Sequence, residues 1–365
     1  MIQSISVRNQ AIDFLRGVAI FLTLFRHFGV NIYLYKIGWV GVDLFFVLSG
    51  FLVSGLLFGE YKNTAKINFV RFFVRRGLKI YPLFYLLFAL YFVDIKLDLN
   101  KKIYYPALIP EALFYKNYVG GDVFWIHTWS IDVEEHFYLL LPFLLLFLIF
   151  IKKNKKNSFK SIPFLFLIIA LSCLILRVLA TLNQPFSHTN NVSPTHLRID
   201  SLFFGTLLSY FYHFHQTQLA NFVKSNKTAL RIGSFILLLP CIIFWDYEPQ
   251  MTTWGFSSLY LGFGGVLLIT IYSNNNHPKF LKKMYVLIAS MGLYSYGIYI
   301  IHWVLIWWFI LPFGEYLDAH YPIKLLAFFI YLAVTFFCGW ALSKTVEIPF
   351  LALRDKLFPS QSKAF

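Results

Sequence analysis

The chain has 365 residues, of which 58% are hydrophobic, 21% aromatic and only 13% charged. A soluble domain carries about 25% charged residues, so this composition excludes an ordinary soluble globular protein. In a soluble chain the net charge of +15 would suggest nucleic-acid binding, but here most Lys and Arg residues lie in short segments between apolar runs. We therefore expect an integral membrane protein whose basic residues set its topology, with the lipid bilayer and no nucleic acid as partner.

The apolar runs predict an all-α, polytopic transmembrane helix bundle of about ten spanning helices, each needing roughly 20 residues. We expect one membrane domain over residues 1–365, without a soluble domain. The longest connection, 96–132, is rich in Tyr, Pro and Trp and is expected to contain re-entrant or interfacial pieces. The predicted spans are 11–32, 38–58, 78–95, 133–151, 162–182, 199–214, 230–246, 254–273, 285–311 and 324–345.

The distribution of Lys and Arg predicts the orientation. With the N-terminus in the cytoplasm, the cytoplasmic segments hold 22 basic residues and the external segments hold 7. This asymmetry predicts a multi-pass membrane protein with both termini in the cytoplasm. The cysteines Cys173, Cys241 and Cys338 lie inside apolar runs without CxxC spacing, so neither a disulfide framework nor a metal site is predicted.

The first predicted helix carries polar residues on one stripe. A charge at the bilayer centre costs about 2.5–3.5 kcal/mol on insertion scales, so such residues are candidates for function. Arg16 and His27 are eleven residues apart, which places them on nearly the same helix face with a rise of about 16 Å. Asp13 lies three residues before Arg16 and is placed to pair with it. A functional stripe and a satisfied core histidine beside a snorkelling arginine both remain open.

The second predicted helix contains Asp43 near its external end. We expect Asp43 to pair with a cation such as Arg26 or Arg198, or with a catalytic histidine. The Ser49-Gly50 pair further along is interpreted mainly as a site of close helix packing.

Four cations, Arg71, Arg75, Arg76 and Lys79, lie at the cytoplasmic mouth of the third predicted helix. Positive-inside anchoring explains them as well as phosphate binding does. Arg side chains suit bidentate phosphate contacts, and helices that begin at this face add favourable dipoles.

Titratable residues also gather at the external mouth of the fourth predicted helix. His127, Trp129, Ser130, Asp132, Glu134, Glu135 and His136 occur within ten positions. Because this segment runs directly into an apolar helix, we expect Glu134 or Glu135 to point into the bundle.

Later helices add further polar residues at similar depths. Arg198 and Asp200 begin the sixth predicted helix, and His302 lies in the external half of the ninth. Glu347 is expected near the Arg75-Arg76 level, where a salt bridge is the favoured interpretation. Two polar layers result, one in the external half around His27 and one at the cytoplasmic face around Arg16.

Seven short motifs follow in chain order: Arg16-x10-His27, Phe45-Phe46-Val47-Leu48-Ser49-Gly50-Phe51, Arg75-Arg76-x-x-Lys79-Ile80-Tyr81-Pro82, Trp129-Ser130-x-x-x-Glu134, Arg198-Ile199-Asp200-Ser201, Ser295 to His302, and Glu347-x-Pro349. In this order they resemble the acyltransferase-3 family of polytopic membrane acyltransferases, from Asp13 to Pro349. Each motif alone is weak, but the ordered set is specific. Lys79 departs from the more usual Arg, which keeps the charge but weakens bidentate phosphate contact.

The resemblance implies transfer of an acetyl or other short acyl group from cytoplasmic acyl-CoA to a hydroxyl of a cell-surface glycan, such as lipopolysaccharide O-antigen, or of a lipid-linked glycan. The sequence leaves the acceptor open among lipopolysaccharide O-antigen, capsule, peptidoglycan and small molecules. The location that the resemblance implies is the bacterial cytoplasmic (inner) membrane. Acetyl-CoA is the expected co-substrate, and no metal is predicted. Some family members carry an additional esterase-like domain, and this chain resembles the stand-alone type.

The expected mechanism places the CoA nucleotide in the cytoplasmic layer and the chemistry near His27. His27 would act as general base on the acceptor hydroxyl or form an acyl-histidine. The candidate residues are His27, Glu134, Asp43 and His302 for catalysis; Arg16, Arg75, Arg76, Lys79 and Tyr81 for acyl-CoA; and Trp129, Ser130, Arg198 and Asp200 for the acceptor. A transporter or flippase for a polar or lipid-linked substrate is the alternative, because intramembrane charges and glycine-interrupted helices fit it too.

Overall fold

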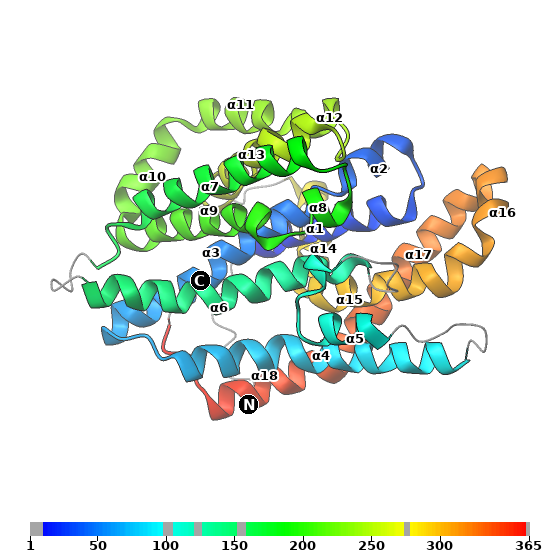
Figure 1. Ribbon diagram of the computed structural model, residues 1–365, viewed down its shortest axis with the longest axis horizontal. Coiled ribbons are helices and arrows are strands. Elements are labelled where there is room, and N and C mark those ends of the chain that lie inside the picture. The colour runs from blue at the N-terminus through cyan, green and yellow to red at the C-terminus, as the bar shows by residue number, and fades with distance from the viewer. Residues whose placement is uncertain (1–9, 98–104, 120–125, 152–157, 274–277, 363–365) are drawn as a thin grey trace.

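The computed structural model describes residues 10–97, 105–119, 126–151, 158–273 and 278–362. Every regular element within these ranges is a helix (Figure 1). This arrangement confirms the predicted all-α class. It also agrees with the requirement that a chain crossing a bilayer satisfy its backbone hydrogen bonds internally.

Six helical segments in the described part of the chain are long and apolar enough to cross a membrane, or seven if the bent pair Gln216–Ser225 and Lys227–Ile243 forms one span. The protein is therefore a multi-pass membrane protein. The count of about ten spans and the cytoplasmic placement of both termini remain predictions. The six segments are Ile32–Thr64, Ile126–Ile151, Ile162–Asn183, Met251–Ile271, Ser295–Ala319 and Tyr321–Leu357.

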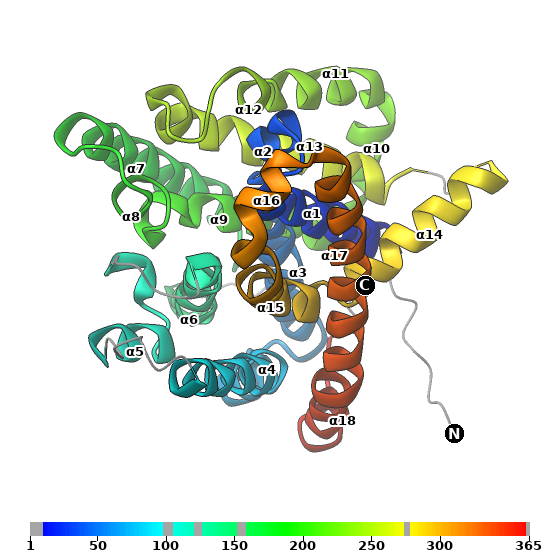
Figure 2. The same cartoon turned by 90° about the vertical axis from the view of Figure 1, so that its right-hand side faces the viewer.

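Two helices occupy the centre of the bundle: α1 (Gln10–Phe28) and α3 (Gly41–Thr64). In the view along the helices, the others surround this pair (Figure 2). In the span that contains α3, 72% of the most apolar stretch is buried inside the protein, whereas in α7 the corresponding share is 17%. The surrounding helices are α6 (Trp129–Ile151), α9 (Thr195–Phe214), α13 (Phe256–Ile271), α14 (Lys279–Leu293), α15 (Ser295–Leu305) and α17 (Tyr321–Leu342).

The remaining helices lie further from the centre. On one side are α7 (Ile162–Asn183), α10 (Gln216–Ser225), α11 (Lys227–Leu238) and α12 (Pro240–Ile243). On the opposite side, α4 (Phe69–Leu97) runs beside α18 (Ile348–Leu357) (Figure 1). The short helices are α2 (Ile32–Gly38), α5 (Tyr105–Ala112), α8 (His188–Asn191) and α16 (Gly314–Ala319).

One predicted span is wrong in its continuity. The segment 285–311 contains two helices, α14 and α15, which meet at Tyr294, a residue outside helical geometry at φ −103° and ψ 13°. The physical reason lies in the partners of each half. A Cβ atom on Gly292 would lie 1.8 Å from the Asp13 carbonyl of α1, and one on Gly297 would lie 2.6 Å from the Gly339 carbonyl of α17. These two close contacts direct the halves toward different neighbours.

The predicted connection 96–132 is partly helical where it is described. It contains α5 and two 3-10 turns, Lys116–Tyr118 and Ile126–Thr128. Residues 98–104 and 120–125 lie outside the described part, so the expected re-entrant or interfacial pieces stay a prediction there.

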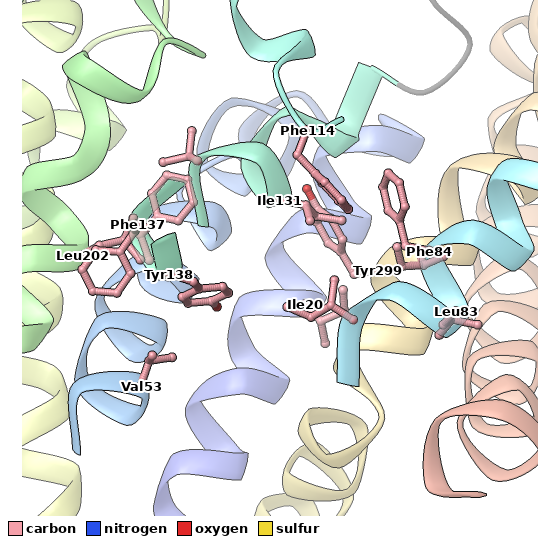
Figure 3. Packing of buried hydrophobic residues seen from close by; sticks show 14 of the residues in the cluster. Ile20, Val53, Leu83, Phe84, Phe114, Ile131, Phe137, Tyr138, Leu202 and Tyr299 are labelled. Atoms are coloured by element: carbon pink, nitrogen blue, oxygen red, sulfur yellow. The ribbon is translucent and has the colours of Figure 1, made fainter. Parts of the chain in front are cut away.

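The buried apolar core joins helices that are distant in sequence. Its members include Ile20 of α1, Val53 of α3, Phe84 of α4, Phe137 of α6 and Leu202 of α9 (Figure 3). Within a membrane, lipid tails are as apolar as these side chains, so close packing rather than removal from water stabilises the contacts.

A second close helix contact occurs where α3 packs against α9. A Cβ atom on Gly50 would lie 1.9 Å from the Leu202 carbonyl oxygen, and one on Gly205 would lie 2.3 Å from the Val47 carbonyl oxygen. The two glycines therefore allow the two backbones to touch, which confirms the packing role predicted for Gly50.

We predict that Gly50→Ala destabilises the protein by about 1–3 kcal/mol, because overpacking must move a helix backbone. The measurement is the midpoint of thermal unfolding of the purified protein in detergent. Gly233→Ala is the matched control, because nothing lies within 4 Å of a Cβ at Gly233 of α11. Equal midpoints for the two variants would contradict the inferred crossing.

Candidate functional site

A cavity of about 340 Å³ lies between α3, α4, α6 and α15, and α18 closes one end. One end is basic, the middle is mainly apolar, and the other end is formed by Ser130 and Tyr299. This arrangement fits a long ligand with a negatively charged head and a thin, largely uncharged arm.

Six cations line the basic end: Arg16, Arg71, Arg75, Arg76, Lys79 and Arg354. The cytoplasmic layer predicted from the sequence is thus brought together, and Arg354 of α18 is an addition that the sequence did not identify. So many like charges on one cavity repel one another and attract a polyanion.

Some of these cations are neutralised and others are not. Arg71 pairs with Glu60 at 3.2 Å, and Arg16 lies 4.0 Å from Asp13, the partner predicted for it. Arg76 lies 4.8 Å from the ring centre of Tyr138. Among the described residues, Lys79 has no hydrogen bond or ion pair, so its ammonium group is available to a ligand.

Two residues predicted near this layer have other partners. Tyr81 does not line the cavity and donates a hydrogen bond to Glu135 at 3.0 Å, since two helical steps turn it away from Lys79. Glu347 accepts a hydrogen bond from Ser343 at 2.8 Å. The salt bridge expected for Glu347 near Arg75 and Arg76 is absent from the described ion pairs. The Ser343 hydroxyl, one helical turn before Glu347, donates to the Glu347 carboxylate instead.

The middle of the cavity is apolar except at Glu134. α3 contributes Val42, Phe45, Leu52, Val53 and Leu56, among others. Ser49 donates to Glu134 Oε1 at 2.7 Å, and the Tyr138 hydroxyl donates to Oε2 at 2.5 Å. Of the two carboxylates considered, Glu134 points into the bundle, and it is held by these hydroxyls.

The far end of the cavity is a layer of hydrogen-bonded groups. The hydroxyls of Ser130 and Tyr299 lie 2.6 Å apart, and Tyr299 donates to the His127 carbonyl at 2.6 Å. The backbone carbonyl of Tyr299 lies 2.5 Å from His302 Nδ1. Tyr299 therefore links the cavity to the histidine side chains beyond it.

Three histidines gather at that point. His27 Nδ1 of α1 lies 2.9 Å from His302 Nε2 of α15, and the ring of His127 lies 4.8 Å from that of His302. Trp303 and His27 pack in a T-shaped arrangement with their ring centres 5.1 Å apart. His302 and His127 are buried, whereas His27 is only partly buried. His27 is therefore the member of the cluster that a substrate can approach.

The hydrogen bonds define the tautomers of the pair. A carbonyl only accepts, so His302 Nδ1 must carry the proton that it shares with Tyr299. In a neutral His302, Nε2 is then an acceptor, and His27 Nδ1 must donate to it. His27 Nε2 consequently keeps its lone pair and is the basic atom of the site.

Asp43 belongs to a separate buried network. Its Oδ1 lies 2.5 Å from Arg198 Nη2, and both side chains are at most 1% exposed. Arg177 pairs with Asp200 at 2.9 Å with both side chains at 0% exposure. The Arg198 guanidinium also lies 3.7 Å from the ring centre of Phe256. The predicted pairing of Asp43 with Arg198 is thus confirmed, while Arg26 pairs with Asp246 at 2.6 Å instead.

Trp129 connects this network with the cavity. Its ring lies 5.8 Å from the Arg198 guanidinium and packs edge-on against Phe46, a cavity residue. Arg198 and Asp200, predicted to bind the acceptor, are held in ion pairs. Their predicted contact with an acceptor remains a prediction.

Sequence reasoning did not assign roles to His127, Tyr299 or Arg354. A signal existed for two of them. His127 is two residues before Trp129, and Tyr299 lies three residues before His302 on the same face of its helix. Arg354 had no such signal, because a cation beyond the last span is usually an anchor.

Comparison with known proteins gives a consistent result. The acyltransferase-3 family model, described as "Acyltransferase domain", matches residues 9–344. "Peptidoglycan O-acetyltransferase OatA" of Listeria monocytogenes is 29% identical, over 81% of this chain and 49% of that protein. "O-acetyltransferase OatA" of Staphylococcus aureus is 26% identical, over 81% of this chain and 50% of that protein. The chain thus spans about half the length of these relatives. No solved structure matches it.

We predict that Asp43→Ala lowers stability by about 3–5 kcal/mol, because it leaves the Arg198 charge buried and uncompensated. Replacing both residues, Asp43→Leu with Arg198→Leu, should recover most of the loss. The measurement is again the thermal midpoint in detergent.

Asp318→Ala is the control for this experiment, since Asp318 is 70% exposed and its pair with Lys324 should contribute less than about 1 kcal/mol. If Asp43→Ala kept full stability and lost only activity, the carboxylate would act in the chemistry rather than in support of Arg198.

Proposed function

The chain belongs to the acyltransferase-3 family, and we propose that it is a membrane O-acetyltransferase using acetyl-CoA as donor and a glycan hydroxyl as acceptor. The observation that carries the proposal is a cavity with cations at one end and, beyond Tyr299 at the other, the His27–His302 pair. This is the arrangement needed when a polyanionic donor is held at one level and used at another.

The donor's chemistry matches the cavity section by section. CoA carries several phosphate charges, which are costly to bury but are favourably bound by Arg and Lys. Its pantetheine arm is thin and only moderately polar, as is the section between α3 and α6. The acyl end would then reach Ser130 and Tyr299. Along α1, the helical rise from Arg16 to His27 is about 16 Å, which an extended arm can span.

The proposed reaction uses His27 as general base. His27 Nε2 removes the proton from the acceptor hydroxyl as its oxygen attacks the thioester carbonyl. Collapse of the tetrahedral adduct forms the ester and breaks the C–S bond, and the imidazolium returns the proton to the departing thiolate. His302 accepts from His27 Nδ1–H and so fixes the ring and its tautomer, the part that a carboxylate plays in a serine triad.

The sequence predicts Glu134 and Asp43 as catalytic residues, and either carboxylate could orient the His27 ring. In this structure the hydrogen-bond partner of His27 is His302, while Glu134 is held by Ser49 and Tyr138. We propose that Glu134 is a polar contact for the pantetheine arm of the donor in an otherwise apolar section of the cavity.

Direct transfer and an acyl-histidine intermediate both use the Nε2 lone pair of His27. Trapping of acetylated His27 in the absence of acceptor would identify the acyl-histidine route.

The acceptor is proposed from the relatives and the topology. The Listeria relative is named for peptidoglycan, so we propose a sugar hydroxyl of peptidoglycan or of its lipid-linked precursor, ahead of lipopolysaccharide O-antigen. The proposed location is the bacterial cytoplasmic membrane, with the basic end of the cavity facing the cytoplasm. Mass spectrometry of surface glycans from cells with and without the protein identifies the acceptor.

We predict that His27→Ala lowers acetyl transfer by about 10²–10⁴-fold, the usual contribution of a general base. Binding of CoA should be unchanged, since the cations of the basic end remain in place. The measurement is release of free CoA thiol by purified protein with acetyl-CoA and a glycan acceptor.

His320→Ala is the matched control, because His320 is exposed and its ring packs on Tyr316 of the peripheral helix α16. Near-normal transfer by a correctly inserted His27→Ala protein would refute the mechanism. If the protein were a transporter, neither the wild type nor His27→Ala would release free CoA thiol.

We also predict that Lys79→Gln raises KM for acetyl-CoA about tenfold with little change in kcat, because phosphate binding is common to ground and transition states. Lys79→Arg should restore binding. The control is Lys66→Gln, an exposed lysine near the same end of the bundle but outside the cavity. Equal effects at both lysines would indicate general charge rather than a phosphate site.

A further inference from the structure

The C-terminal helix α18 lies against α4 at the basic end of the cavity (Figure 1). Its residues follow the family match, which ends at residue 344. Arg354 of α18 lines the cavity, together with Ser360, Gln361 and Ser362 of the segment that follows. A part of the chain outside the matched region thus forms one wall of the cavity.

The contacts of Asp355 explain how this wall is held. Asp355 Oδ1 lies 2.9 Å from Arg75 Nη1 of α4. The same carboxylate accepts from Arg354 Nε at 2.9 Å and from Arg354 Nη2 at 3.0 Å. One carboxylate therefore neutralises two arginines that both line the cavity.

The segment after α18 is tied down through its backbone. The Phe358 carbonyl accepts a hydrogen bond from Arg75, and the Gln361 carbonyl accepts one from Asn63 of α3 at 2.7 Å. Arg75 thus contacts α18 through a carboxylate and the following segment through a carbonyl. The position of Arg354 relative to the other cations is set by these contacts.

The Asp355 carboxylate is poorly suited to be a permanent partner. Its side chain is 55% exposed, and exposed ion pairs contribute little to stability. A phosphate group offers more acceptor oxygens and more charge than a carboxylate, and it binds Arg in a bidentate manner. Phosphate is therefore expected to replace Asp355 on the two arginines.

We propose that Arg354 is a donor-binding residue that contacts a phosphate group of CoA, and that Asp355 holds Arg354 and Arg75 in place until that phosphate replaces it. The proposal rests on the proposed function, because it assumes acyl-CoA in this cavity. It adds to that function a binding residue from the C-terminal helix and a carboxylate that competes with the donor.

The test compares Arg354→Gln, Arg354→Lys and Lys356→Gln in purified full-length protein. Lys356 is the matched control, because it is an exposed cation two residues away on the same helix and outside the cavity. Arg354→Gln should raise KM for acetyl-CoA about tenfold with kcat nearly unchanged. Arg354→Lys should recover part of the affinity, and Lys356→Gln should behave like the wild type.

A second donor separates phosphate binding from a structural role. S-acetyl-pantetheine lacks the nucleotide phosphates, so Arg354→Gln should leave its KM unchanged. Equal losses with both donors would overturn the proposal, because they would mean that Arg354 supports the fold of the cavity. Asp355→Asn should lower KM for acetyl-CoA, and an increase in KM would overturn the competing role of the carboxylate.

Failure of this inference is distinguishable from failure of the proposed function. If the wild type neither binds CoA nor releases its thiol, the proposed function fails and this inference fails with it. If the wild type turns over acetyl-CoA and Arg354→Gln does so with the same KM, only the inference fails.

Discussion

A charge inside an apolar bundle must be compensated by another charge, by a ligand or by water, and this constraint organises the whole structure. Two buried ion pairs compensate such charges, with side chains that are at most 1% exposed: Arg198 with Asp43, and Arg177 with Asp200. These pairs join α3, α7 and α9 and leave those helices little freedom to slide. Lys79 and Arg76 instead line a cavity, where a bound ligand can compensate their charge. The difference separates charges that stabilise the fold from charges that await a ligand.

The histidine pair depends on the same rigid framework. The basic lone pair of His27 is defined only if His302 donates to the Tyr299 carbonyl and accepts from His27. Tyr299 in turn is held by the Ser130 hydroxyl and the His127 carbonyl. The residues that close the cavity therefore also set the tautomers beyond it. The end of the cavity and the basic atom of His27 are therefore linked through one residue, Tyr299, by its hydroxyl on one side and its backbone carbonyl on the other.

Much of the site could be predicted because it rests on local spacing. Helical periodicity placed Arg16 and His27 on one stripe, and clustering identified the basic end of the cavity. The pairing of His27 with His302 could not be derived, since it joins residues 275 positions apart. That pairing depends on the break at Tyr294 and on the close contacts of Gly292 and Gly297, which only tertiary packing determines.

The same limit explains the contacts that the sequence did not predict. Glu347 and Tyr81 both lie in motifs near the basic residues. Glu347 instead accepts from the nearby Ser343 hydroxyl, and Tyr81 is turned by the helix toward Glu135. Arg354 and Asp355 lie after the last predicted span, where charges usually act as topology signals. The position of Arg354 on the cavity, with Asp355 beside it, follows from the packing of α18 against α4, which no local pattern encodes.

The cavity itself follows from the division of α3 into two faces. Val47 and Gly50 face α9, where the Gly50 and Gly205 contacts bring the backbones together. Phe45, Ser49, Leu52 and Leu56, at helical spacing on the other side, line the cavity. Because α3 is drawn close to α9 on one face, it leaves space toward α4 and α6 on the other. The small residues of this helix thus do more than permit packing: they leave room for a ligand between the basic end and Tyr299.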